Sequence, residues 1–283
     1  MSQRFKKLYF VVCVVILFLC ISTSTVQAQM SNDEMLKTAD KARGNLEGIQ
    51  WDISMHSIER GREQDRKLLV IAKGYNSLID TLAPGNLKGQ KLMMQDRNMW
   101  FAKPGLSKPV PISPRQKLMG DASNGDIAAT NYSADYKIVG SEEGKFNDED
   151  CILLTLQAAD KRATYDRVKY WISKKRILGL KAEFYTISGK MFKTAVFEYK
   201  NRINVDDKPQ EFISKMIITN AIVKDDVTTV NYSRPLLKKV PDATFNLKLL
   251  VGSEVTPLVV SGTQVSVVCA EIRPQPTAGP VKT

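Results

Sequence analysis

The feature that most constrains the fold is a repeated alternation of apolar and polar residues over short segments. In residues 167–172, for example, the even-numbered positions are apolar and would share one face of a strand. Turn-forming sequences such as Pro84–Gly85–Asn86 and Ser188–Gly189–Lys190 separate several segments. The segments with strand character lie near residues 51–55, 69–73, 75–82, 89–95, 98–103, 135–140, 150–157, 166–173, 180–186, 192–200, 212–223, 226–233 and 245–250. Many short strands between regular turns predict a mainly β fold with a few helices, built on an antiparallel sheet or barrel.

Two segments depart from this alternation. Ser31 to Glu34 form a capping-box sequence, and a helix ending near Gly44 is expected after it. Its buried stripe is predicted from the apolar residues at helical spacing, Met35, Leu36, Ala39 and Ala42. Residues 114–131 predict one or two short helical turns, with Ser123 and Asp126 as caps. An ordinary surface loop is the alternative for this second segment.

The N-terminal 28 residues have the organisation of a secretory signal peptide. Three basic residues precede an apolar run over residues 8–21, and Val26–Gln27–Ala28 offers small residues for cleavage after Ala28. The run is short for a membrane span, which needs about 20 apolar residues, so an uncleaved anchor is the less favoured alternative. We therefore expect a signal peptide over residues 1–28, one domain over residues 29–250, and an extension over residues 251–283 with one strand and a disordered end.

The sequence has no motif of an enzyme or a metal centre. His56 is the only histidine, so a Ser–His–acid triad or a histidine-based metal site would depend on it alone. No segment resembles a nucleophile elbow or a glycine-rich phosphate loop. We predict that the chain is not an enzyme and uses no cofactor or metal. A hydrolase with two distant carboxylates is the alternative that sequence alone leaves open.

The net charge and the cysteine content restrict the kinds of molecule that the chain is expected to bind. The formal net charge is +11, and loss of the signal peptide would leave the chain basic. Nucleic acid is a poor partner for an exported protein, whereas an anionic membrane surface or an acidic headgroup is a better one. An ordinary lysine-rich surface explains the charge equally well. Outside the signal peptide the cysteines are Cys151 and Cys269, and whether they pair stays open.

One region resembles a known signature. Trp100 and Phe101 lie at a strand end that leads to Pro104–Gly105, and Arg115 precedes Leu118–Met119–Gly120–Asp121. This arrangement is similar to the W-x-x-x-P strand end, the arginine-containing stretch and the Met–Gly–Ser/Asp–Asp element of the LolA-like family of outer-membrane lipoprotein-sorting proteins.

Further elements follow the order of that family. Tyr170–Trp171–Ile172 precedes a lysine-rich turn, and Pro241–Asp242–Ala243–Thr244–Phe245 looks like the closing strand of the family. The resemblance extends over residues 33–249. The chain departs from the family where Gly120–Asp121–Ala122 replaces Gly–Ser–Asp, which leaves the register of the acidic residues open.

The resemblance implies a curved antiparallel sheet that forms a half-open barrel, closed by the N-terminal helix and a short helical lid. It also implies a periplasmic carrier that binds lipid or lipoprotein acyl chains and takes part in outer-membrane lipoprotein sorting. The residues expected to line its cavity and lid are Trp51, Ile53, Leu69, Ile71, Leu92, Met94, Trp100, Leu118, Met119, Ile127, Trp171 and Phe184. Leu118, Met119 and Ile127 are expected to form a mobile lid.

A second hypothesis has a filled interior. The same apolar residues would form the core of a non-enzymatic module of the cell envelope, and its basic surface would bind anionic membranes. The sequence does not separate the two hypotheses, because apolar strand residues can line a cavity or fill a core. It also leaves open the identity of the lipid and the oligomeric state.

Overall fold

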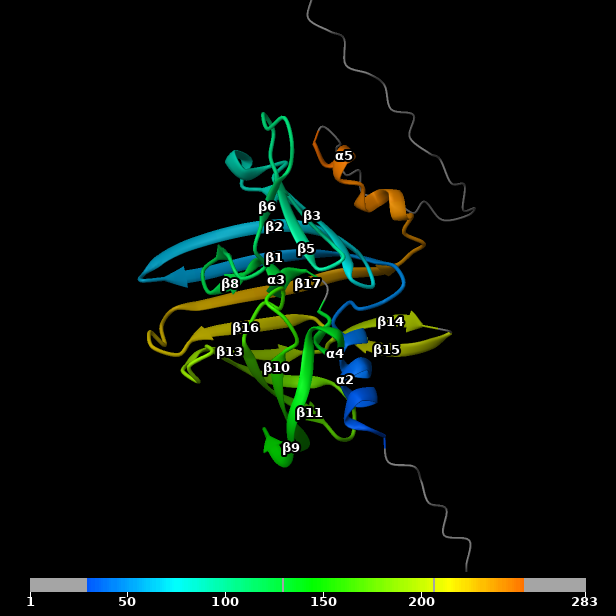
Figure 1. The fold of residues 1–283 in the computed structure, drawn as a ribbon, viewed down its shortest axis with the longest axis vertical. Helices are drawn as coiled ribbons and strands as arrows, with labels where there is room; N and C mark the ends of the chain where they lie inside the picture. The colour runs from blue at the N-terminus through cyan, green and yellow to red at the C-terminus, as the bar shows by residue number, and fades with distance from the viewer. Residues whose placement is uncertain (1–29, 129, 206, 252–283) are drawn as a thin grey trace, which may run out of the picture. The chain divides into compact units, whose positions relative to one another are not determined.

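The computed structural model describes residues 30–128, 130–205 and 207–251. Its centre is a 13-stranded antiparallel sheet (Figure 1). In spatial order its strands are β6 (Val110–Ile112), β5 (Asn98–Ala102), β4 (Lys91–Gln95), β3 (Asn76–Ala83), β2 (Arg62–Lys73), β1 (Ile49–Glu59), β17 (Val227–Leu237), β16 (Lys215–Asn220), β13 (Met191–Glu198), β12 (Gly179–Tyr185), β11 (Arg167–Ser173), β10 (Glu149–Ala158) and β9 (Tyr136–Phe146). The predicted signal peptide, Cys269 and the strand expected in the extension lie outside the described residues.

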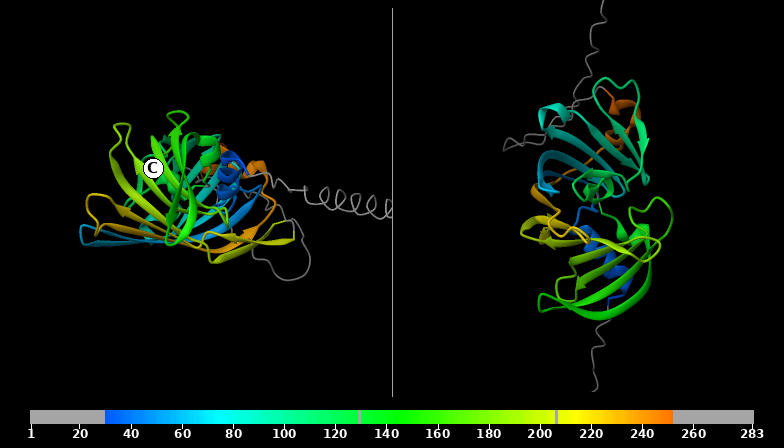
Figure 2. Two further views of the ribbon diagram at one scale, coloured as in Figure 1. Left: turned by 90° about the horizontal axis from the view of Figure 1, so that it is seen from below. Right: turned by 90° about the vertical axis from the view of Figure 1, so that its left-hand side faces the viewer.

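Smaller elements surround this sheet. Two hairpins pair β7 (Lys117–Met119) with β8 (Ala122–Ser123), and β14 (Asn201–Val205) with β15 (Lys208–Phe212). The helices are α2 (Asn32–Lys41), η1 (Gly85–Leu87), α3 (Asn124–Ile127), α4 (Tyr132–Asp135), η2 (Asp242–Phe245) and α5 (Leu247–Leu250). The sheet curves around α2, α3 and α4, and it does not close into a barrel (Figure 2). The predicted fold class is confirmed.

Strand alternation sets the two faces of the sheet. On β11, Val168, Tyr170 and Ile172 have no exposed surface and pack in the main core, as the sequence pattern predicts. We call this side, which α2 covers, the inner face. The main core lies on the inner face because the curvature brings the apolar residues of distant strands around α2.

The N-terminal helix α2 forms as the capping box predicts. The Glu34 backbone N–H donates to Ser31 Oγ at 3.3 Å, and the Ser31 backbone N–H donates to the Glu34 carboxylate at 3.0 Å. Met35, Leu36 and Ala39 are buried against the sheet. Gly44 follows with a φ of +106°, and a Cβ there would lie 2.9 Å from the Trp51 ring.

The strand predicted over residues 245–250 is wrong, and so is the closing strand expected from Pro241 to Phe245. These residues form η2 and α5, which pack on β3 and β4. Phe245 and Leu250 are buried, and Asp242 pairs with Lys73 at 2.6 Å. Lys73 belongs to the row of β2 that faces away from α2, so this segment covers the outer face of the sheet. Apolar and polar residues alternate over residues 245–249, and so short a pattern does not separate a strand from a short helix.

Candidate functional site

The inner face of β2 changes from apolar to cationic along its length. The register pairs Trp51 with Val70, Ile53 with Leu68, and Met55 with Arg66. Val70 and Leu68 are therefore core residues, whereas the next inner-face residue is Arg66, which is half-buried. This row ends beside the segment that connects β6 to α3.

A groove of about 490 Å³ lies at this end of the inner face. Its apolar lining consists of Leu92, Phe101, Ile112 and Leu118. Its polar lining consists of Arg66, Gln90, Gln116, Lys117 and Asn124. Its volume falls within the range of about 300–1,000 Å³ that is typical of small-molecule sites. The groove brings together two residues predicted for the cavity, Leu92 and Leu118.

Other predicted site residues share the inner face but belong to the core. Met94 is half-buried against this core. The side chains with 3% exposed surface or less are Trp51, Ile53, Met119, Ile127 and Phe184. They lie on the expected side of the sheet, where they fill the space under α2 and α3. Their predicted contact with a ligand stays a prediction.

Four predicted residues do not join this group. The register places Leu69 and Ile71 on the outer face, under the segment that carries Phe245. Trp100 alternates onto the outer face with Met93. Trp171 also alternates away from Tyr170, and its ring centroid lies 4.3 Å from Lys181 Nζ. Residues 68–72 are apolar without interruption because β2 is covered on both faces, so the sequence offered no alternation to assign the sides.

The segment over β7, β8 and α3 covers the inner face, and buried charges hold it there. Lys193 Nζ of β13 lies 2.7 Å from Asp126 Oδ2, and both side chains are at most 5% exposed. Tyr165 Oη donates to Asp126 Oδ1 at 2.6 Å, and the Ser123 backbone N–H donates to Asp126 Oδ2 at 2.8 Å. Burial, together with the nearby Asp126 carboxylate, raises the pKa of Tyr165.

The buried ion pair and hydrogen bonds of Asp126 argue against the prediction that the whole segment over β7, β8 and α3 moves as a lid. Met119 and Ile127 are 3% and 1% exposed, so moving them would open the core. A Cβ on Gly120 would lie 2.1 Å from Thr228 Oγ1, because the backbone there sits directly on the sheet. Of the three residues predicted for the lid, only Leu118 lines the groove.

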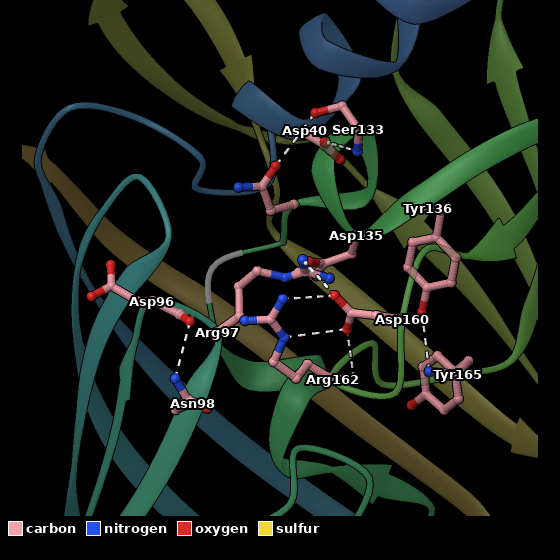
Figure 3. Close-up of polar contacts among 11 residues, drawn as sticks. Asp40, Asp96, Arg97, Asn98, Ser133, Asp135, Tyr136, Asp160, Arg162 and Tyr165 are labelled. Carbon is pink, nitrogen blue, oxygen red and sulfur yellow. Dashed lines mark hydrogen bonds and ion pairs between the residues drawn. The ribbon is translucent and has the colours of Figure 1, made fainter.

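Ion pairs bridge elements from the two ends of the sheet (Figure 3). Arg97, in the turn between β4 and β5, contacts Asp135 at 2.6 Å and Asp160 at 3.1 Å. Asp135 ends α4, just before β9, and Asp160 lies between β10 and β11. Hydrogen bonds from Arg162 lower the pKa of Asp160. Arg115 adds a second bridge, since its Nη1 lies 2.8 Å from Asp166.

A second buried cluster joins α2 to the sheet. Arg43 is 5% exposed, and its guanidinium carbon lies 4.2 Å from the Phe197 ring centroid and 5.1 Å from that of Tyr132. Asp40 has no exposed surface, and its Oδ2 accepts the Ser133 backbone N–H at 2.8 Å. Burial raises the pKa of Asp40 to about 7.

Several groove residues were not predicted from the sequence. Arg66, Gln90 and Ile112 carry no motif, and Phe101 belongs to the aromatic signature but was not among the residues predicted for the cavity. One signal could have found Arg66: it continues the row of Val70 and Leu68 at a spacing of two, so it had to share their face.

Within residues 30–128, 130–205 and 207–251, no helix combines the length and apolar character needed to cross a membrane. In the same residues, no three His, Cys, Asp or Glu side chains are grouped to hold a metal ion. Cys151 is buried, and its pairing with Cys269 is untested because Cys269 lies outside them.

Comparisons with known proteins agree with the fold. A family model described as "Uncharacterized protein" matches residues 73–251, and no curated protein matches the sequence. A LolA superfamily protein from Nitrosomonas europaea is 29% identical, with a TM-score of 0.68 over 77% of this chain and 98% of that chain.

Two more solved structures share the fold at lower identity. A domain described as outer membrane lipoprotein-sorting, from Vibrio parahaemolyticus, is 20% identical, with a TM-score of 0.66 over 77% of this chain and 97% of that chain. A DUF1329 family protein from Desulfovibrio piger is also 20% identical, with a TM-score of 0.62 over the same shares of the two chains. The chain belongs to the family of the matching model, and its fold is that of the LolA superfamily.

Proposed function

We propose that this chain is a periplasmic carrier that binds lipid or lipoprotein acyl chains in the groove between β2, β4, β5 and β7. The observation that carries the proposal is a groove of about 490 Å³ with an apolar wall of Leu92, Phe101, Ile112 and Leu118. An acyl chain needs no hydrogen bonds, and each of its methylenes gains about 0.8 kcal/mol on burial. The predicted signal peptide supports export, and the fold of lipoprotein-sorting relatives supports a carrier rather than an enzyme.

The direct test is the content of the native protein. We expect the mature chain, purified from its native host and extracted with organic solvent, to release lipid or to co-purify with lipoproteins. A chain purified without detergent that carries neither, and that binds no acyl probe in solution, would contradict the carrier function.

A substitution in the groove tests its position. Leu118→Ser should weaken binding of a fluorescent acyl probe about tenfold, because it removes apolar contact from the wall at a side chain that is only half-buried. Met119→Ser is the matched control: Met119 is 3% exposed, so this variant should lower the free energy of unfolding by about 2–4 kcal/mol. If Leu118→Ser binds the probe as the parent does, the groove is not the acyl site.

The filled interior favours a second candidate, a module that binds anionic membrane surfaces. Large side chains such as Trp51, Tyr170 and Phe184 occupy much of the inner face. This candidate predicts binding to anionic vesicles that weakens with added salt, together with an absence of extractable lipid. Binding that ignores ionic strength would exclude it.

A further inference from the structure

The groove has an electrostatic polarity that an acyl chain alone does not explain. Its apolar wall lies on β4, β5, β6 and β7, and Arg66 and Lys117 add cationic groups to the same lining. None of the described residues that line the groove carries a carboxylate. The amide side chains of Gln90, Gln116 and Asn124 add neutral hydrogen-bonding groups. The lining thus combines an apolar wall with a cationic group.

The two cations differ in how far they are neutralised. Lys117 forms an ion pair with Glu59, so its charge is largely offset. Arg66 has no ion pair among the described residues, and its Nε is buried without a hydrogen-bond partner in that part of the chain. Burial lowers the pKa of the Arg66 guanidinium, as expected when a charge loses water without gaining a counterion.

A half-buried guanidinium without a partner is costly, and an anion in the groove would satisfy it. A guanidinium presents several N–H donors in a plane, which matches the two oxygens of a carboxylate or phosphate. The adjacent wall of Leu92, Phe101 and Leu118 offers a fully polar anion no hydrogen bonds, whereas an apolar chain would bury its surface there. An occupant that is apolar along one part and anionic at one end fits both the apolar wall and Arg66.

We propose that the groove recognises an anionic amphiphile, whose acyl chain lies against the apolar wall and whose carboxylate or phosphate accepts hydrogen bonds from Arg66. This inference rests on the proposed function and narrows its ligand class. Arg66 then selects the headgroup, whereas Leu118 and its neighbours bind any acyl chain.

The experiment compares amphiphiles of equal chain length with the full mature chain, below their critical micelle concentrations. The probes are a fatty acid, an anionic lysophosphatidylglycerol and a neutral alkyl maltoside, and isothermal titration calorimetry gives each Kd. The variants are Arg66→Gln, Arg66→Lys and the control Arg62→Gln, which changes an exposed arginine at the start of the same strand. Thermal unfolding of each variant verifies that it is folded.

We expect Arg66→Gln to weaken binding of both anionic probes about tenfold, which corresponds to about 1.4 kcal/mol, because the variant loses a charge-assisted hydrogen bond to the headgroup. Binding of the neutral probe should change by less than about twofold, and Arg66→Lys should retain part of the anionic preference. A fatty acid that binds more tightly than the lysophospholipid would identify a carboxylate as the natural headgroup, and the reverse order would identify a phosphate.

Two outcomes overturn the inference in distinguishable ways. If the parent binds all three probes and Arg66→Gln weakens them equally or not at all, the headgroup assignment fails while the carrier function stands. If the parent binds none of the probes, the carrier function fails, and the headgroup assignment fails with it.

Discussion

At the scale of single residues, Asp40 is a buried group whose protonation affects stability near neutral pH. It has no exposed surface, and the groups that face it are Arg43, Tyr132 and the Ser133 backbone N–H. Because burial raises the pKa of Asp40 to about 7 in the folded chain, above its ordinary value of about 3.9, the folded state holds this proton more tightly than the unfolded state does.

The sign of the pH dependence follows directly. The stabilisation from protonated Asp40 is complete below about pH 4, and it is lost as the pH rises through about 7. Asp40→Asn keeps a neutral side chain at every pH. From pH 5 to pH 8 the parent should therefore lose about 2–3 kcal/mol of unfolding free energy that the variant retains.

Urea unfolding at pH 5 and pH 8 measures this change. Asp148→Asn, in an exposed turn, is the matched control and should show no such trend. If the difference in unfolding free energy between Asp40→Asn and the parent is the same at both pH values, the raised pKa of Asp40 does not cause the pH dependence.

At the scale of elements, the Lys193–Asp126 pair determines how the segment of β7, β8 and α3 is held. A buried ion pair gains little over an apolar contact, but removing one partner leaves an unpaired buried charge. Lys193→Met should therefore lower the free energy of unfolding by about 3–5 kcal/mol in urea denaturation.

A control variant and a double variant show whether the loss of stability comes from the unpaired buried charge. Lys200→Met removes a lysine that is 78% exposed from its pair with Glu198, and it should cost less than about 1 kcal/mol. Adding Asp126→Asn to Lys193→Met should recover part of the lost stability, because it removes the orphaned charge. A loss below about 1 kcal/mol for Lys193→Met would show that the segment is not held by this pair.

The elements also show where sequence reasoning succeeds. Helix α2 was predictable because its capping box and apolar spacing are local. Strands such as β11 were predictable because one face is buried and the other is not. The segment from η2 to α5 was not, because its conformation depends on the outer face of β3 and β4, which only the tertiary fold creates.

In the candidate site, too, residues were predictable where the signal is local and were missed where it depends on the tertiary fold. Leu92 and Leu118 were found because apolar residues near the family signature were candidates for a cavity. Leu69 was misplaced because both faces of β2 are covered, and Arg66 was missed because its importance depends on the lack of a nearby carboxylate. Sequence patterns indicate the class of a residue's environment, whereas its partners come from strands far apart in the chain.

At the scale of the whole sheet, Arg97 joins elements near its opposite ends. Its two partners, Asp135 and Asp160, are 24% and 35% exposed, so water partly screens both pairs. Arg97→Gln should therefore increase local opening, and hydrogen exchange in β5 and β9 should accelerate up to about tenfold.

Hydrogen-exchange mass spectrometry of peptides from these strands provides the measurement. Arg234→Gln is the control, because Arg234 is 82% exposed and pairs with Asp52 elsewhere on the sheet. Added salt should accelerate exchange in the parent more than in Arg97→Gln. Equal exchange in all three chains would show that the bridge does not restrain the sheet ends.

An open sheet also has consequences for contact between copies of the chain. In the described residues, β6 and β9 each have one side without a neighbouring strand, and such edges can template strand addition by another molecule. β6 is only three residues long and contains Pro111, which has no backbone N–H to donate. β9 carries Glu142, Glu143 and Lys145, and its register shifts near Gly140. Both edge strands thus disfavour hydrogen bonding to a strand of another molecule. The sheet can therefore remain open without promoting aggregation.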